Sequence, residues 1–195
     1  MKLNVVEEDS EKPWYADGLK FTCSQCGNCC TGGPGFVWIS QEEIVRLAEF
    51  LKITPEETVE KYCRKFDGRF SLRERRTREG LYDCIFLKEQ EVPTPEGGSP
   101  QSVPLRRKMC SIYPVRPLQC RTWPFWPENL ASPEAWDRAA KRCHGMSRGN
   151  RTFTQEQLEA IRDSRDWPEN PPTSAGTAPA PSSGTPGEGW GGGSV

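Results

Sequence analysis

The chain carries four of its nine cysteines within eight residues, in the sequence Cys23-Ser24-Gln25-Cys26-Gly27-Asn28-Cys29-Cys30. Two residues between cysteines let neighbouring thiolates reach one metal centre, because the chain can fold back around the ion. Gly27 suits such a turn, since glycine adopts positive φ without strain. A glycine- and proline-rich run, 31–35, follows directly, so we expect these cysteines on a loop. Metal ligation is the favoured interpretation, and structural or disulfide cysteines are the alternative.

Composition limits what the chain can bury and bind. It has 195 residues, which suggests one domain. Only 34% are hydrophobic and the mean hydropathy is −0.73, so the core must be small, and a bound metal would add folding free energy. The formal net charge of −1 argues against a general role in binding nucleic acid. No apolar run approaches the roughly 20 residues that span a bilayer, so no membrane partner is expected.

The cysteines are expected to be reduced. The first nine residues lack the apolar segment of a signal peptide and turn acidic, from which we expect a cytoplasmic protein. Thiols stay reduced in that compartment. The odd number of cysteines and the adjacent pair Cys29-Cys30 also fit a disulfide framework poorly.

Local signals predict a small α+β fold, metal-organised, with three or four short helices and a β-hairpin around a cysteine cluster. Capping boxes at 40–43 and 54–57 predict two helices, the second with an apolar stripe of Val59, Tyr62, Cys63 and Phe66. A hairpin is predicted over 70–87, with its turn at 77–80. N-caps at Ser132 and 154 predict two further helices.

The expected organisation has three parts. Residues 1–19 form a polar lead-in, in which Trp14 and Tyr15 are possible anchors onto the body. Residues 20–166 form the metal-binding domain, with an exposed Pro- and Gly-rich insertion at 88–108. The Pro-, Gly- and Ser-rich tail, 167–195, is expected to be disordered because it cannot bury enough apolar surface.

Several residues have two readings. Cys63 lies at a core position, so packing is favoured over ligation. His144, the single histidine, could complete a site beside Cys143 or lie at the surface. The aromatic residues at 123, 125 and 126 could shield a site from water or form ordinary core. The arginines between 69 and 78 could meet an anionic partner, although a solvated hairpin face is the simpler explanation.

The cysteine pattern as a whole resembles the CxxCxxCC cysteine-cluster family, also called YkgJ-like and described as a zinc- or iron-chelating domain. Beyond the first motif, the resemblance rests on Cys84-Ile85-Phe86-Leu87, the stretch from Cys110 to Arg121, and Cys143 shortly before a glycine. It covers roughly residues 20–148. It implies eight metal-binding cysteines, Cys23, Cys26, Cys29, Cys30, Cys84, Cys110, Cys120 and Cys143, and leaves Cys63 outside the motif.

The spacing favours an iron–sulfur cluster over zinc. Three cysteines at successive two-residue intervals resemble the start of a ferredoxin run. A zinc site more often takes one Cys-x-x-Cys pair from each of two knuckles, and the chain has no second pair. Mixed or transient binding is a further alternative. How the eight cysteines divide between sites is left open.

Three functions are compatible with such a centre. The first is a metal- or cluster-binding protein in which the site organises the fold and serves electron transfer or sensing. The second is a cluster-dependent enzyme acting on a protein substrate by redox chemistry or group transfer, since a flagellin lysine methylase carries a similar cluster. The third is a metal carrier with exchangeable ligands. The sequence has no phosphate-binding glycine loop, nucleophile elbow or acid–base histidine network, which argues against an enzyme and favours the first function. Whether the protein is an enzyme, any catalytic residues and a protein partner stay open.

Overall fold

The computed structural model describes residues 12–92 and 105–167. Its helices and 3₁₀ turns are η1 (Asn28–Cys30), α1 (Gln41–Leu51), α2 (Pro55–Tyr62), η2 (Tyr113–Val115), α3 (Leu118–Thr122), α4 (Pro127–Leu130), α5 (Pro133–Ala140) and α6 (Gln155–Asp163). Its strands are β1 (Leu19–Lys20), β2 (Thr31–Gly32), β3 (Trp38–Ile39), β4 (Cys63–Phe66), β5 (Arg69–Leu72), β6 (Glu74–Arg76), β7 (Tyr82–Cys84), β8 (Leu87–Val92), β9 (Leu105–Cys110) and β10 (Thr152–Phe153). The α+β prediction is confirmed, with more helices than the three or four expected.

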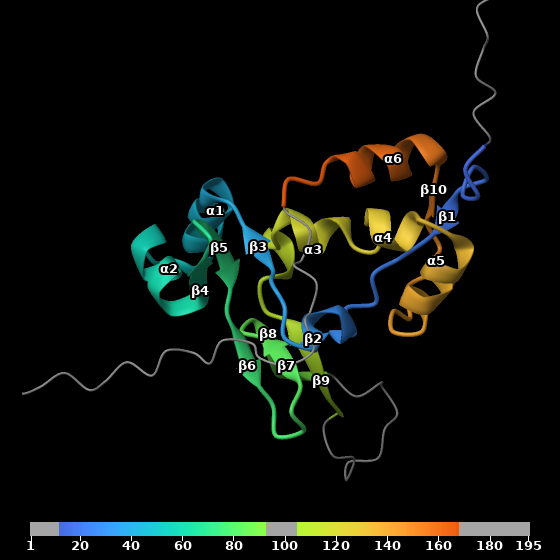
Figure 1. The fold of residues 1–195 in the computed structure, drawn as a ribbon. Helices are drawn as coiled ribbons and strands as arrows, with labels where there is room; N and C mark the ends of the chain where they lie inside the picture. The colour runs from blue at the N-terminus through green and yellow to red at the C-terminus, as the bar shows by residue number, and fades with distance from the viewer. Residues whose placement is uncertain (1–11, 93–104, 168–195) are drawn as a thin grey trace, which may run out of the picture.

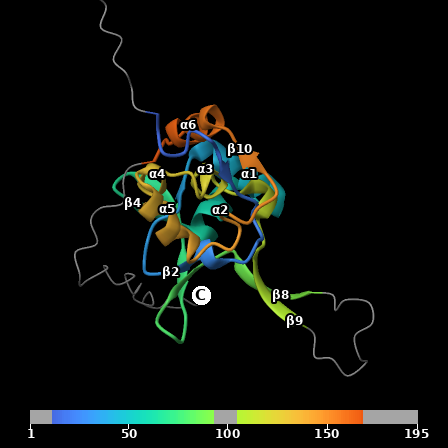
Figure 2. The same ribbon diagram turned by 90° about the vertical axis from the view of Figure 1, so that its right-hand side faces the viewer.

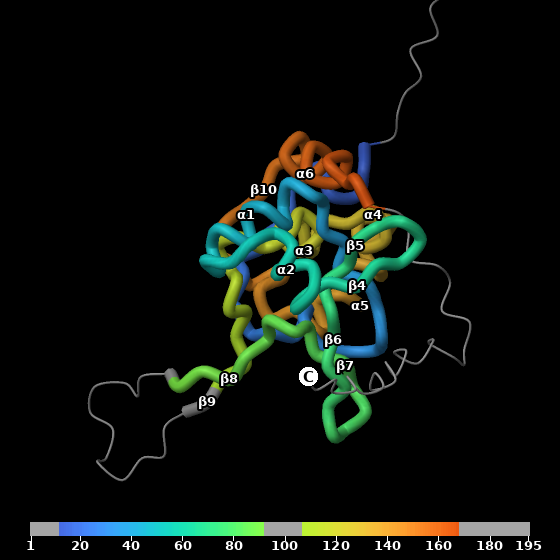
Figure 3. Tube along the Cα trace, turned by 90° about the vertical axis from the view of Figure 1, so that its left-hand side faces the viewer, coloured from blue at the N-terminus to red at the C-terminus, as the bar shows by residue number. Residues whose placement is uncertain are grey.

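The strands form small antiparallel sheets, ordered β1-β10, β2-β7-β6, β3-β5-β4 and β8-β9. Figure 1 shows α1, α2 and the β3-β5-β4 sheet on one side of the molecule and α4, α5, α6 and β10 on the other, with α3 between them. The β6-β7 and β8-β9 hairpins extend away from the helices and diverge from each other (Figures 2 and 3). Within the described residues, no helix is long and apolar enough to cross a bilayer.

Capping explains where the main helices begin. The Ser40 hydroxyl accepts from the Glu43 amide while the Glu43 carboxylate accepts from the Ser40 amide, and Thr54 and Glu57 do the same for α2. Each exchange satisfies two amides that a helix start leaves free. Ser132 caps α5, and the box at 154–157 caps α6. These predicted helix starts are confirmed.

One predicted helix ends earlier than expected. The sequence placed Cys63 and Phe66 on the stripe of the second helix, but α2 ends at Tyr62 and 63–66 is strand β4. The register pairs Cys63 with Leu72 and Phe66 with Arg69 across a tight turn. Cross-strand pairing therefore overrides the helical pattern there.

The predicted hairpin around the turn at 77–80 is present as β6 and β7, whereas residues 69–72 pair in the neighbouring sheet. The expected exposed insertion at 88–108 begins in β8 and ends in β9, and the side chains of 88–91 are exposed. Its middle, the first 11 residues of the lead-in and the tail from 168 lie outside the described residues.

Two groups of buried side chains stabilise the fold. The first core joins α1, the β3-β5-β4 sheet and the strands around Cys84, and contains Ile39, Ile44, Leu47, Cys63, Leu72, Cys84, Phe86, Leu87 and Ile112. The second core joins the N-terminal residues to α4, α5 and α6, and contains Tyr15, Phe125, Leu130, Trp136, Met146, Phe153 and Leu158. Tyr15 therefore does anchor the lead-in. Cys30 and Cys110 pack against the first core and Cys143 against the second, so cysteine-bearing segments reach both.

Candidate metal centre

One cavity of about 440 Å³ collects the cysteines of the predicted motif. All eight of them line it: Cys23, Cys26, Cys29, Cys30, Cys84, Cys110, Cys120 and Cys143. Cys63 does not line it and lies 2% exposed in the first core, as its favoured reading expected. His144 is exposed and also lies outside the cavity lining.

The first cysteine segment is a loop that turns at Gly27. Gly27 has φ 76° and precedes η1, and the Cys30 amide donates to its carbonyl at 2.8 Å. A Cβ at this position would lie 2.8 Å from Leu87 Cδ1 and 3.0 Å from the Lys108 carbonyl oxygen. Both the dihedral angle and the close approach therefore require glycine. The turn leaves Cys29 exposed and Cys30 half-buried, with their sulfur atoms 3.8 Å apart.

The next two cysteines come from the strands beneath this loop. Cys84 ends β7 and Cys110 ends β9. Asp83, which precedes Cys84, is buried and accepts from the Thr31 hydroxyl at 2.6 Å and the Lys108 ammonium at 2.8 Å. One carboxylate therefore joins the segments that carry Cys30, Cys84 and Cys110.

The last two cysteines lie on or beside helices. Cys120 belongs to the single turn of α3, and Cys143 follows the end of α5. Arg142 binds the first loop: its guanidinium donates to the Thr31 carbonyl at 2.6 Å, and its own carbonyl accepts from the Asn28 side chain at 2.9 Å. The Thr22 amide donates to the Gly145 carbonyl at 3.1 Å. These bonds hold the cysteine at the end of α5 beside the cysteine loop over 100 residues away in sequence.

Electrostatics disfavour several thiolates together in this cavity. Burial, followed by the charges of neighbouring cysteines, raises the pKa of Cys120, and burial raises the pKa of Cys84 to about 11. Burial also raises the pKa of Cys110. Cys29 differs: the hydrogen bond with Cys30 lowers its pKa to about 7, with help from the charge of Arg116. A bound cation would offset the mutual repulsion of these thiolates.

The cavity is also lined by aromatic and basic side chains. Trp123 and Trp126 line the cavity, whereas Phe125 lies in the second core, so the two readings of these aromatic residues both apply. Burial raises the pKa of Glu74, which also lines the cavity and pairs with Arg64 at 3.2 Å. The sequence reasoning missed Asp83 and Arg142, and the only signal was their position directly before a cysteine.

The eight cysteines are suitable metal ligands and line one cavity, but their sulfur atoms are not arranged around a common point. Over 12–92 and 105–167, no three side chains of histidine, cysteine, aspartate or glutamate form a group that could hold a metal ion. Binding would therefore require the sulfur atoms to move closer together. The cavity gathers thiols, and an ion or cluster would have to order them.

Comparison with known proteins shows that the part of the chain that carries the cavity cysteines matches a known family. The profile of the CxxCxxCC family, described as "Putative zinc- or iron-chelating domain", matches residues 22–144. The chain is 29% identical over 111 residues to the uncharacterized protein MJ0661 of Methanocaldococcus jannaschii. The aligned region covers 57% of this chain. The chain spans about half the length of that relative, 48%. No solved structure matches. The chain belongs to the CxxCxxCC family, and its matched region holds all eight motif cysteines.

Proposed function

We propose that this protein binds an inorganic metal centre through the cysteines of its cavity, and that the centre is an iron–sulfur cluster in preference to zinc. One observation carries the proposal: eight cysteines from separate parts of the chain line a single cavity, and Cys63, the ninth, does not. Cysteines that served only packing, as Cys63 does, would have no reason to face one common cavity.

The preference for iron–sulfur rests on the first loop. Cys23, Cys26 and Cys29 follow one another at two-residue intervals and all line the cavity. Such a run suits a cluster whose remaining ligand comes from elsewhere in the chain, and five further cysteines line the same cavity. When bound, a cluster would supply one-electron chemistry. The protein's own residues would hold it, exclude water with Trp123 and Trp126, and offset its negative charge with arginines at the cavity.

The test is elemental analysis of protein purified without oxygen. We expect iron and sulfide, with the visible absorption of sulfur-to-iron charge transfer. Colourless protein with stoichiometric zinc would reject the cluster and keep the metal centre. A reduced, folded sample holding neither metal would reject both. Cys26→Ser should lower the metal content, and Cys63→Ser, which changes a cysteine outside the cavity, is the matched control.

A metal carrier is the second candidate, because Cys29 is exposed whereas Cys84 is buried. An incoming thiolate can bind the ion and displace an exposed ligand while the remaining ligands still hold the ion. Transfer of the metal to a chelator should then be faster in Cys29→Ser than in the wild type at equal loading, because the position that Cys29 must vacate is already weakly held. Transfer at an unchanged rate would exclude a carrier route through Cys29.

A further inference from the structure

Glu43 stands out among the capping residues because it is buried. Three capping boxes have Glu43, Glu57 and Gln157 at equivalent positions. The Glu57 side chain is 43% exposed and pairs with Lys61 on its own helix, whereas the Glu43 side chain is 8% exposed. Burying a carboxylate is costly unless both of its oxygens are satisfied. The capping box accounts for only one of the two Glu43 carboxylate oxygens, so the other must have a partner elsewhere in the protein.

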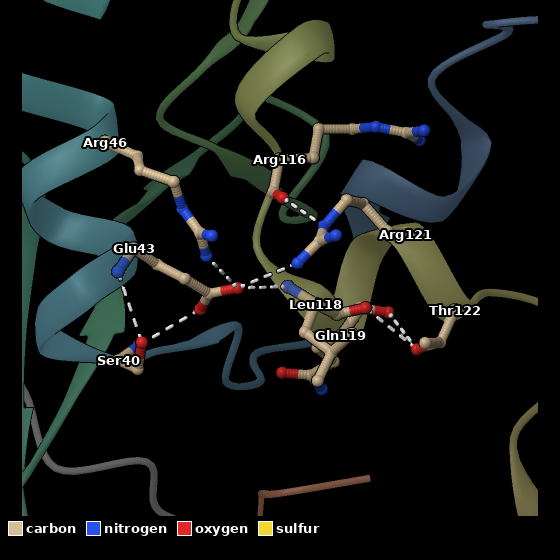
Figure 4. Close-up of polar contacts among 8 residues, drawn as sticks. All are labelled: Ser40, Glu43, Arg46, Arg116, Leu118, Gln119, Arg121 and Thr122. Carbon is tan, nitrogen blue, oxygen red and sulfur yellow. Dashed lines mark hydrogen bonds and ion pairs between the residues drawn. The ribbon is translucent and has the colours of Figure 1, made fainter. Parts of the chain in front are cut away.

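The two oxygens of Glu43 serve different parts of the chain. Oε2 completes the capping box by accepting from the Ser40 amide at 3.1 Å. Oε1 accepts from the Leu118 amide at 2.7 Å, and the guanidiniums of Arg121 and Arg46 lie 3.4 and 3.7 Å from it. Figure 4 shows these groups converging on the carboxylate from α1 and α3.

Leu118 is the first residue of α3, the turn that carries Cys120. The residue before it is Pro117, which supplies no side-chain cap. The carboxylate of Glu43 thus satisfies the first amide of α3 from another helix and places negative charge at its start. Gln119, in the same turn, connects α3 to the chain around β3: its side chain accepts from the Trp38 amide at 2.7 Å and donates to the Phe36 carbonyl at 3.2 Å.

We infer that Glu43 is a positioning residue that fixes Cys120 for metal binding by holding the first amide of α3. This inference rests on the proposed function. A carboxylate is needed because both neighbours, the Ser40 and Leu118 amides, are donors, and glutamine offers one acceptor oxygen where glutamate offers two. Gln157 shows that glutamine is sufficient for a capping box. Glu43→Gln should therefore keep the start of α1 and lose one of these two bonds.

The experiment measures metal affinity by competition with a chelator in the reduced protein, using whichever of iron or zinc the purified protein holds. Loss of a residue that orients a metal ligand typically weakens affinity about 10–100-fold. We expect that loss for Glu43→Gln and an unchanged affinity for Glu57→Gln, the equivalent position in an exposed capping box. The ligand-to-metal charge-transfer band should also shift in Glu43→Gln.

A double mutant separates positioning from general stability. If Glu43 acts through Cys120, Glu43→Gln should weaken binding no further once Cys120→Ser is present. An equal effect with and without Cys120, or an effect matched by Glu57→Gln, would overturn the inference. So would Cys120→Ser that binds as tightly as the wild type. In each of these cases the wild type still binds metal, whereas failure of the proposed function appears as a wild type that binds none. Should Glu43→Gln not fold, Leu118→Pro removes the amide from which Oε1 accepts and leaves the carboxylate in place, since proline suits the first position of a helix; unchanged affinity there would overturn the inference as well.

Discussion

The buried carboxylate of Asp83 gives the sharpest prediction about what stabilises the cavity. Asp83→Asn removes the charge that holds the Lys108 ammonium at 2.8 Å and turns an amide N–H₂ toward one of its two donors. A hydrogen bond to a charged group contributes about 1.5–3 kcal/mol. The Lys108 side chain is 45% exposed, so solvent reduces its share, while Asp83 itself is buried. We therefore expect Asp83→Asn to lower the free energy of unfolding by about 1.5–3 kcal/mol.

The assay is urea unfolding followed by tryptophan fluorescence, with matched metal content in all samples. Asp163→Asn is the control, because Asp163 pairs with Arg162 at a similar distance, 2.7 Å, but its side chain is 63% exposed. Its effect on the free energy of unfolding should be much smaller. If the two substitutions cost the same, burial does not strengthen the Asp83 contacts and the reasoning is refuted.

The same comparison has a defined pH dependence. Burial alone would raise the pKa of Asp83, but the hydrogen bonds from Lys108 and Thr31 and nearby positive charge outweigh it and lower the pKa below its ordinary 3.8. The stabilisation is therefore complete above the unfolded pKa and is lost only as the pH falls through the lower folded pKa. Between pH 7 and 5 the difference between wild type and Asp83→Asn should stay constant. A difference that disappears within that range would contradict a lowered pKa.

Three further predictions address other parts of the molecule. Cys63→Ser should keep the full metal content by elemental analysis while losing about 1–3 kcal/mol of unfolding free energy, because it buries a hydroxyl in the first core; loss of metal would show that Cys63 is a ligand. Phe125→Ala should cost about 3–5 kcal/mol in urea unfolding, since its ring packs against those of Phe21, Trp136 and Phe153; a loss below 1 kcal/mol would contradict a close-packed second core. Gly145→Ala should lower the thermal midpoint, because its Cβ would collide with the Thr22 carbonyl oxygen, whereas Gly33→Ala meets open space and should not.

Local signals in the sequence predicted most helix starts because each depends on neighbouring residues. Ser40 and Thr54 satisfy amides three residues away, so the chain itself contains the whole interaction. The end of α2 was predicted incorrectly because Cys63 pairs with Leu72, and a strand partner outweighs the apolar spacing. Strands of two residues, such as β1 and β10, leave no periodic pattern to detect.

The cavity was anticipated only as a list of cysteines. Spacing identified the loop from Cys23 to Cys30, and the resemblance to a family supplied the distant members. The polar residues that hold those segments were not apparent, because Asp83 and Arg142 have no motif of their own. Glu43 was recognised as a cap, and its bond to Leu118, 75 residues away, depends entirely on how α1 packs beside α3.

The pairing of β1 with β10 has a consequence for how the protein is made. Leu19 pairs with Phe153, and the Thr22 amide bonds to Gly145, so the segment leading into the first cysteine is held by residues synthesised more than 120 positions later. A ribosome exposes Cys23 to the solvent long before these contacts exist. The complete set of thiols can therefore be held together only after the chain has been synthesised past Phe153, and acquisition of the metal follows the synthesis of that segment.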